Sequence, residues 1–120
     1  MDDTPIDEEA TRRRLDAERK KLQGLVEGLR TETRQVETEQ VGELSSYDQH
    51  PADLGSETFE REKDLSILEG LETELAEVEA ALRRLAVGTY GIDEVTGERI
   101  DPERLEAIPE ARTNVDTRRD

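Results

Sequence analysis

The sequence predicts a mainly α-helical protein, with a long antiparallel coiled-coil hairpin over residues 1–87, a small module over residues 88–117 and a tail over residues 118–120. Three observations lead to this prediction. Two long segments carry apolar residues at heptad spacing, and a loop-forming segment separates them. The composition is 32% hydrophobic and 41% charged, with two tyrosines and one phenylalanine as the aromatic residues. Such a composition supplies too little apolar surface for a multilayer core. It is more typical of long amphipathic helices.

The first helix is expected over about residues 5–40. Thr4 can cap it, Pro5 suits the first helical position, and Asp7 stands where a capping box places an acid. Apolar residues then repeat every seven positions, with two further residues widening the stripe: Leu15, Leu22, Leu25, Val26, Leu29 and Val36. This pattern predicts a helix with a narrow apolar seam.

A second helix is expected over about residues 56–87. Its apolar residues alternate spacings of three and four: Leu68, Leu71, Leu75, Val78, Leu82 and Leu85. Arg83 and Arg84 lie in the last turns, where the helix dipole favours cations. Gly88 can adopt the left-handed conformation that commonly ends a helix. An apolar seam of this kind is buried when it packs against a second helix, so a partner helix is expected.

Residues 41–55 form the expected connection between the two helices, because glycine, serine, proline and aspartate cluster there. If the helices pair so that opposing residue numbers sum to about 100, the two heptad seams coincide. The pairs are Leu15 with Leu85, Leu22 with Val78, Leu29 with Leu71, and Val36 with Leu65. The turn then falls inside the proline-containing segment, which favours a hairpin. Two helices of a dimeric bundle are the alternative.

The module after Gly88 has a different pattern. Residues 89–100 have the sequence TYGIDEVTGERI, which predicts two short strands about a turn at residues 95–97. Asp101 and Pro102 then start a short helix that runs to about Ala107, and Pro109 ends it. The apolar residues expected to pack in this module are Tyr90, Ile92, Val95, Ile100, Leu105 and Ile108.

The charge and the missing cysteines exclude several classes of protein. With 32 acidic and 17 basic residues, the net charge is −15, which opposes direct binding to nucleic acid and favours a monomer. Without cysteine there is neither a disulfide nor a thiolate zinc site. Neither a signal peptide nor an apolar run long enough for a bilayer is found, so a cytoplasmic protein without membrane contact is expected.

Charge is also polarised along the hairpin. Between Arg34 and Arg61 there is no lysine or arginine, and the stretch contains seven acids: Glu37, Glu39, Glu43, Asp48, Asp53, Glu57 and Glu60. Basic residues gather near the other end: Arg12, Arg13, Arg14, Arg19, Lys20, Lys21, Arg83 and Arg84. An acidic tip of this kind suits entry into a positively charged cavity. Solvation of a coiled coil is the simpler explanation for most of the individual charges.

Two motifs resemble the DksA/TraR family of bacterial transcription regulators. They are LSSYDQHPADLGSETFEREKD, in the expected tip, and GTYGIDEVTGERIDPERLEAIPEAR, beyond the hairpin. The match runs over residues 43–117, and the first helix matches in pattern alone. The resemblance implies a protein that binds RNA polymerase and not DNA. Its coiled-coil tip would enter the secondary channel and change the stability of promoter complexes, and ppGpp is a candidate co-effector.

The tip motif of that family is Asp-x-x-Asp-x-Ala, which this chain matches in part. The second aspartate corresponds to Asp53, whereas His50 and Gly55 stand at the other two positions. We hypothesise that Asp48 supplies the missing carboxylate, and that Leu54 helps to shape the approach to the polymerase active site. His50 is also a candidate pH sensor, although a solvent-facing turn residue is the simpler assignment.

The resembling family carries a zinc finger with four cysteines after the hairpin. The corresponding residues here are Asp93, Thr96, Asn114 and Thr117. Three neutral oxygen-bearing side chains and one carboxylate make a poor zinc site. We therefore expect a zinc-finger-like module that folds without zinc and without any other cofactor. Ca²⁺ or Mg²⁺ in place of zinc is the alternative.

No pattern in the sequence predicts catalysis, so the protein is expected not to be an enzyme. Stimulation of transcript cleavage by an acidic tip is a minority alternative. Docking on polymerase is assigned to the basic residues near the base of the hairpin: Arg12, Arg13, Arg14, Arg83 and Arg84. The alternative function is a structural or adaptor coiled coil that derives from such a regulator and binds a different protein.

Overall fold

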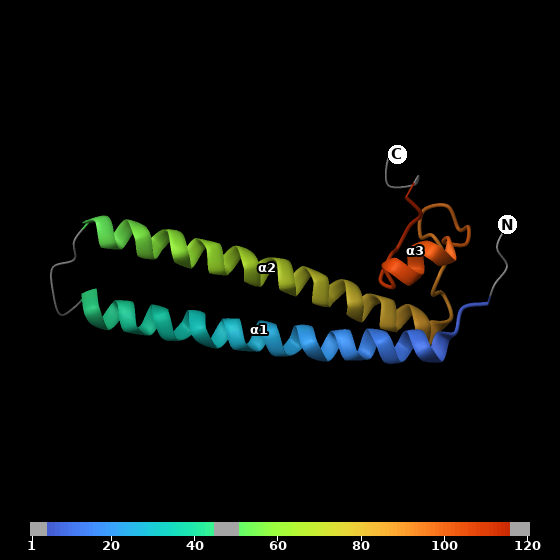
Figure 1. Ribbon diagram of the computed structural model, residues 1–120, viewed down its shortest axis with the longest axis horizontal. Coiled ribbons are helices and arrows are strands. Elements are labelled where there is room, and N and C mark those ends of the chain that lie inside the picture. Colours follow the sequence, from blue (N-terminus) through green and yellow to red (C-terminus); the bar gives the residue numbers. More distant parts are fainter. Residues whose placement is uncertain (1–4, 45–50, 116–120) are drawn as a thin grey trace. The chain divides into compact units, whose positions relative to one another are not determined.

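The computed structural model describes residues 5–44 and 51–115, with side chains over residues 5–34 and 58–115. Within these ranges the elements are three helices: α1 (Glu8–Leu44), α2 (Pro51–Val87) and α3 (Pro102–Ala107) (Figure 1). The mainly α-helical class is therefore confirmed. No helix in this part of the chain is both long and apolar enough to cross a bilayer.

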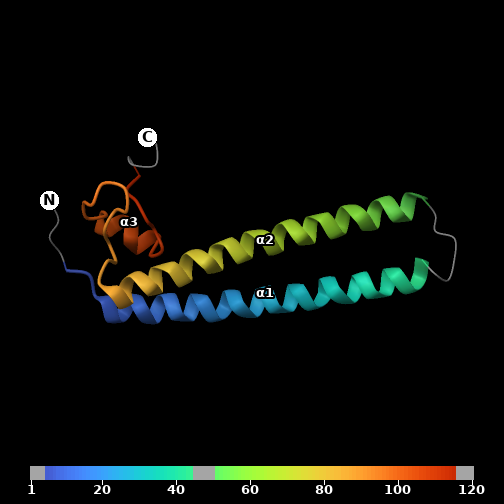
Figure 2. The ribbon, with the colours of Figure 1, turned by 180° about the vertical axis from the view of Figure 1, so that it is seen from behind.

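The chain divides into two compact units. One contains Met1–Lys20 and Leu75–Asp120, and the other contains Lys21–Glu74. Helices α1 and α2 each contribute a segment to both units. Within each unit, these segments lie side by side and run antiparallel, and both views of the chain show the pairing (Figure 1; Figure 2).

Helix α1 begins three residues later than expected. Asp7 is its N-cap, because the carboxylate Oδ1 accepts a hydrogen bond from the Ala10 N–H at 3.0 Å. The first backbone bond of the helix runs from the Thr11 N–H to the Asp7 carbonyl at 3.0 Å. A carboxylate satisfies these exposed N–H groups and also suits the positive end of the helix dipole. Thr4, the expected cap, lies outside the described residues.

Both long helices extend further toward their connection than the sequence indicates. Residues 41–44 belong to α1, and residues 51–55 belong to α2, although both were expected in the loop. Pro51 is the first residue of α2, a position where its missing N–H costs nothing and its fixed φ suits the helix. Gly55 lies inside α2, where glycine costs about 1 kcal/mol relative to alanine without preventing the helix.

The unit Lys21–Glu74 shows the predicted pairing of the two seams. Leu22, Val26 and Leu68 are buried in it. Arg30 Nη2 lies 2.7 Å from Glu72 Oε2, so residues whose numbers sum to about 100 do face each other here. Leu25 is 48% exposed and does not widen the seam.

The other unit has a core that the heptad pattern describes incompletely. Leu15 and Val78 are buried as expected, but so are Ala80 and Ala81. Ala81 lies between Glu77 and Arg84 on one face of α2, because residues three and four apart are neighbours on a helix. Both flanking side chains bond to the segment at residues 110–112. The small alanine side chain therefore lets that segment lie close to the helix.

Helix α2 ends as predicted, at a glycine with positive φ. Gly88 has φ +83°, and the Thr89 N–H donates to the Arg84 carbonyl at 2.9 Å. This bond reaches back to the third residue before the cap, as in a Schellman motif.

The expected pair of strands is not found in the described residues, where a single antiparallel bridge joins Ile92 and Arg99. The Asp93 N–H donates to the Glu98 carbonyl at 2.7 Å, and the Ile100 N–H donates to the Gly91 carbonyl at 2.8 Å. Extended pairing stops there for a local reason. Gly91 has φ +81°, which turns the chain on one side, and Asp101 begins a helix on the other.

Helix α3 matches its prediction. The Asp101 carboxylate accepts a hydrogen bond from the Glu103 N–H at 3.0 Å, and Pro102 occupies the first turn. Three of the six expected core residues of this module are buried, namely Tyr90, Ile100 and Leu105. The other three are exposed, namely Ile92, Val95 and Ile108.

Candidate functional site

The carboxylate of Asp93 is the most deeply buried polar group in the described part of the chain, with an exposed fraction of 0%. Its Oδ1 accepts hydrogen bonds from the Val95 N–H at 2.8 Å and the Thr96 N–H at 3.1 Å. Its Oδ2 accepts one from the Asn114 N–H at 2.9 Å. The side chain thus closes its own turn and also binds a segment 21 residues away.

Asn114 extends this connection to a third segment. Its Oδ1 accepts from the Asp101 N–H at 2.9 Å, and its Nδ2 donates to the Arg99 carbonyl at 3.1 Å. Thr96 Oγ1 accepts from the Glu98 N–H at 3.2 Å and so tightens the turn. Three of the four residues that correspond to the zinc ligands of the resembling family therefore lie in one hydrogen-bonded centre, while Thr117 lies outside the described residues.

This arrangement does not fit a metal ion. The carboxylate oxygens of Asp93 already face three N–H groups, whose positive ends oppose a cation at the same place. Both polar atoms of the Asn114 side chain are also engaged with backbone groups. Over residues 5–34 and 58–115, no three His, Cys, Asp or Glu side chains gather to hold a metal.

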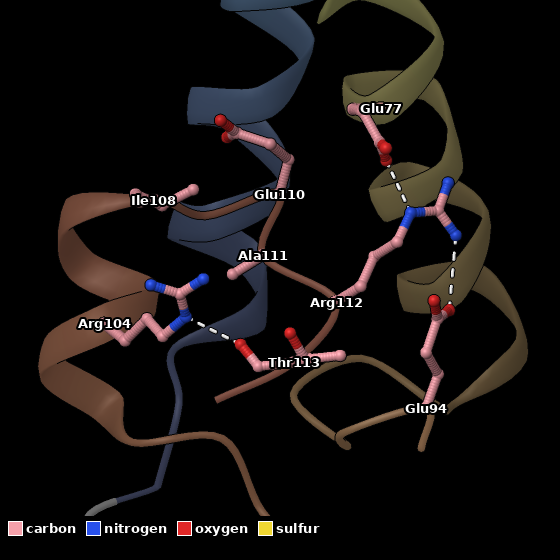
Figure 3. Close-up of a pocket in the computed structure, with 8 residues that line it drawn as sticks. All are labelled: Glu77, Glu94, Arg104, Ile108, Glu110, Ala111, Arg112 and Thr113. Atoms are coloured by element: carbon pink, nitrogen blue, oxygen red, sulfur yellow. Dashed lines mark hydrogen bonds and ion pairs between the residues drawn. The ribbon is translucent and has the colours of Figure 1, made fainter. Parts of the chain in front are cut away.

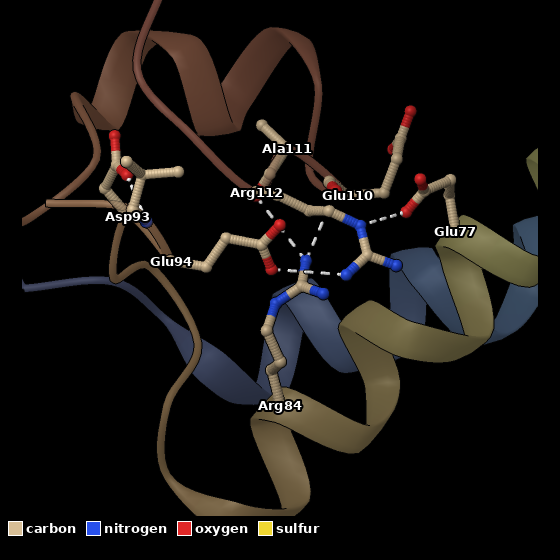
Figure 4. A network of polar contacts seen from close by, with 8 residues as sticks. Glu77, Arg84, Asp93, Glu94, Glu110, Ala111 and Arg112 are labelled. Atoms are coloured by element: carbon tan, nitrogen blue, oxygen red, sulfur yellow. Dashed lines mark hydrogen bonds and ion pairs between the residues drawn. The ribbon is translucent and has the colours of Figure 1, made fainter. Parts of the chain in front are cut away.

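Arg112 joins helix α2 to the turn that follows it. Its Nε lies 2.6 Å from Glu77 Oε2, and its Nη1 lies 3.3 Å from Glu94 Oε2 (Figure 4). The backbone of Glu94 adds a hydrogen bond from its N–H to the Arg112 carbonyl at 3.0 Å. The hydrogen bond that Arg112 donates to Glu77 is the main reason that the pKa of Arg112 is raised. The guanidinium therefore keeps its charge between two carboxylates.

Arg84 approaches the same segment from helix α2. Its Nη2 donates to the carbonyls of Glu110 and Ala111 at 3.2 and 3.5 Å. Burial lowers the pKa of Arg84, and the nearby charge of Arg112 lowers it further. The two backbone carbonyls offset part of this cost, since each directs the negative end of its dipole at the guanidinium.

A cavity of about 380 Å³ opens beside these residues (Figure 3). It is lined by Glu77, Glu94, Arg104, Ile108, Glu110, Ala111, Arg112 and Thr113. Arg112 pairs with two of its three carboxylates, and Arg104 Nε donates to the Thr113 carbonyl at 2.6 Å. The lining holds three carboxylates and two guanidinium groups, so the cavity presents no strong charge of one sign to a ligand.

The proposed docking arginines fall into two groups. Arg14 and Arg84 bond to backbone carbonyls of the module; Arg14 Nη1 donates to the Glu106 carbonyl at 2.6 Å. Arg12, Arg13 and Arg83 are exposed, and Arg12 pairs with Glu9 within α1. Part of the basic cluster therefore stabilises the module at the base of the hairpin.

The side chains of the five residues expected at the tip lie outside the described ones. Asp48 and His50 lie outside the described residues. Asp53, Leu54 and Gly55 lie in the first turns of α2, within the range for which no side chain is described.

The chain is similar in fold to a solved transcription factor. The structure of transcription factor DksA2 from Pseudomonas aeruginosa matches with a TM-score of 0.73 and 30% sequence identity, over 93% of this chain and 80% of that chain. The chain belongs to the DksA family. The DksA-like fold that the tip and module motifs predict is thereby confirmed.

Two curated proteins from Bacillus subtilis (strain 168) are also similar to this DksA-like chain. General stress protein 16O is 42% identical over 100 residues, which are 82% of this chain and 61% of that protein. The uncharacterized protein YteA is 49% identical over 72 residues, which are 60% of this chain and 30% of that protein. The DksA-like chain thus spans less than two thirds of these relatives. No protein-family model matches it.

Sequence reasoning missed the contacts that hold the DksA-like module on the hairpin. Arg112 was given no partner in the sequence analysis, yet it bonds to Glu77, which lies 35 positions earlier. Arg14 was assigned to docking, yet it bonds to residue 106, which lies 92 positions later. An arginine has no periodic signal that identifies a partner at such separations, so these contacts follow from the tertiary structure.

Proposed function

We propose that this DksA-like protein is a transcription regulator that binds RNA polymerase and inserts its acidic tip into the secondary channel. The observation that carries the proposal is the similarity to transcription factor DksA2 over 93% of the chain. In the proposed complex, the tip changes the stability of promoter complexes. The protein itself performs no catalysis.

The distribution of charge supports a tip that enters a positively charged pore. The connection between α1 and α2 lies at the centre of residues 35–60, which contain seven acids and no lysine or arginine. An excess of one sign raises the rate of encounter with a surface of the opposite sign and disfavours wrong surfaces. The overall charge of −15 also disfavours direct binding to DNA.

In the proposed setting, the protein acts as a cytoplasmic monomer, with ppGpp as a candidate co-effector. Arg12, Arg13 and Arg83 are exposed docking candidates that are not assigned here to holding the module. They would contact polymerase outside the channel, while Arg14 and Arg84 hold the module in place.

Transcription in vitro with a matched bacterial polymerase tests the tip. We expect Asp53→Asn and Asp48→Asn each to reduce the effect on promoter-complex lifetime about tenfold or more, since an amide loses the negative charge on which the mechanism depends. Binding to core polymerase should change less, because the docking residues are untouched. The lifetime assay is run with and without ppGpp.

Glu27→Gln is the matched control, since it removes one exposed carboxylate from α1 outside residues 35–60. If both aspartate variants regulate as the unmodified chain does, the acidic-tip mechanism is wrong. If the protein does not bind core polymerase even at low salt, the adaptor function is favoured. The substitutions at His50 and Gly55, two of the three motif positions, motivate that second candidate.

A further inference from the structure

The small module after α2 needs more than its apolar core to hold one conformation. Within residues 88–115, the buried apolar side chains are Tyr90, Ile100, Leu105, Pro109 and Ala111. A segment of this size buries too little surface to be ordered by packing alone, and proteins usually supply a disulfide or a metal. This chain has no cysteine, and the centre around Asp93 does not fit a metal.

We propose that the Asp93 carboxylate and Asn114 replace the zinc ion as the cross-link of this module. A structural zinc joins two chain segments through ligands from each of them. Asp93 and Asn114 join the same two regions through the bond from the Asn114 N–H to Asp93 Oδ2 at 2.9 Å. The Asn114 side chain adds the segment at residues 99–101.

The geometry explains why an aspartate stands at this position. A carboxylate offers two acceptor oxygens and no donor, and here each oxygen faces one or two N–H groups. Bonds from N–H groups to an ionised acceptor are stronger than those between neutral groups. A threonine has one oxygen, and an asparagine would direct its own NH₂ group at a donor.

Amide hydrogen exchange measured by NMR tests the cross-link residue by residue. In the unmodified protein, the Val95, Thr96 and Asn114 amides should be protected. Asp93→Asn should retain protection at Val95 and Thr96 and lose most of it at Asn114, because the amide can present only one acceptor oxygen. Asp93→Ala should lose protection at all three.

Glu98→Gln is the matched control, because it neutralises an exposed acid in the same turn and should leave all three amides protected. If the Asp93 variants do not fold the module, Asn114→Ala provides a milder change. It keeps the N–H that bonds to Asp93 and releases the Arg99 and Asp101 backbone groups. Loss of the module's structure in Asn114→Ala, with the helical circular dichroism signal retained, also supports the proposal. Unchanged protection at Asn114 in both Asp93 variants would overturn it.

Metal dependence is the second measurement, and it uses Tyr90 as a local probe. The chain has two tyrosines, so Tyr47→Phe leaves Tyr90, which is buried in the module, as the sole source of tyrosine near-ultraviolet circular dichroism. We expect that signal to be unchanged by a strong chelator or by added zinc, and the purified protein to contain no stoichiometric metal. A chelator-induced loss of the signal, or one bound zinc per chain, would contradict the proposal.

Discussion

Gly91 has a backbone conformation that favours glycine, and it also has a close neighbour. Its φ is +81°, and a Cβ built on it would lie 2.9 Å from Ile6 Cδ1. Gly97 has a similar φ of +77° but open space around it. Both glycines are therefore favoured by their backbone conformation, but only Gly91 also has a neighbour close to the position of a Cβ.

We expect Gly91→Ala to destabilise the protein more than Gly97→Ala does. Each substitution places a side chain in the left-handed region, at a cost of about 1–2 kcal/mol. Only Gly91→Ala also requires the end of the Ile6 side chain to move, which adds a small further cost. Unfolding by urea measures both changes. Ile6→Ala should reduce the difference in stability between the two glycine variants. If that difference is the same with Ile6 and with Ala at position 6, contact with Ile6 is not its cause.

Tyr90 is buried, and its hydroxyl donates to the Pro109 carbonyl at 2.8 Å. Burial is the main cause that raises the pKa of this phenol from 10.0 to about 12. The folded protein therefore favours the neutral form of the side chain. Its contribution to stability is complete below pH 10 and is lost as the pH rises through about 12.

We expect the free energy of unfolding to fall on the order of 1–2 kcal/mol between those pH values because of Tyr90. The measurement is urea unfolding across alkaline pH in the Tyr47→Phe background, together with titration of the tyrosine absorbance. Tyr90→Phe is the control and should lack this component. A Tyr90 absorbance change centred near its ordinary pKa would show that the phenol is not buried.

At the scale of elements, sequence signals located the helices better than their ends. The heptad seams, Gly88 and Asp101 predicted α2 and α3 because these signals act over one or two turns. The starts of α1 and α2 were misplaced. Thr4, Pro5 and Asp7 offer overlapping start signals, and the carboxylate of Asp7 makes the observed cap. Loop-forming residues at 51–55 are also compatible with a first helical turn.

The short helix α3 depends on its N-cap, since six residues form few internal hydrogen bonds. We expect Asp101→Ala to cost about 1 kcal/mol, because the Glu103 N–H then loses its acceptor. Chemical denaturation measures the loss, and amide exchange at Glu103 locates it. Asp101→Asn should retain most of the stability, because asparagine caps about as well as aspartate. An equal loss in both variants would show that capping is not the cause.

For the whole molecule, the separation of acid from base predicts a salt-dependent interaction. The Debye length falls from about 10 Å at 0.1 M salt to about 3 Å at 1 M, so attraction at a distance is lost. We expect association of the protein with core polymerase to weaken at least tenfold over this range. Stopped-flow or interferometry measurements should show most of the change in the association rate.

A variant in which Glu37, Glu39 and Glu43 are changed to glutamine should show a shallower salt dependence. Changing three acids outside residues 35–60, Glu18, Glu27 and Glu32, gives the same net charge and serves as the control. Equal slopes for the two triple variants would indicate that net charge, and not its position, controls association.

The sequence alone determined the helical class, the hairpin pairing and the two motifs that predict a DksA-like fold. These properties depend on periodicity and on residues close together in the chain. The tertiary structure decided how the module is held. Ala81 is buried, Arg112 pairs with Glu77, and Asp93 accepts a hydrogen bond from Asn114. The physical reason is that each of these contacts depends on segments that are distant in the sequence, so the partners meet only when the chain is folded.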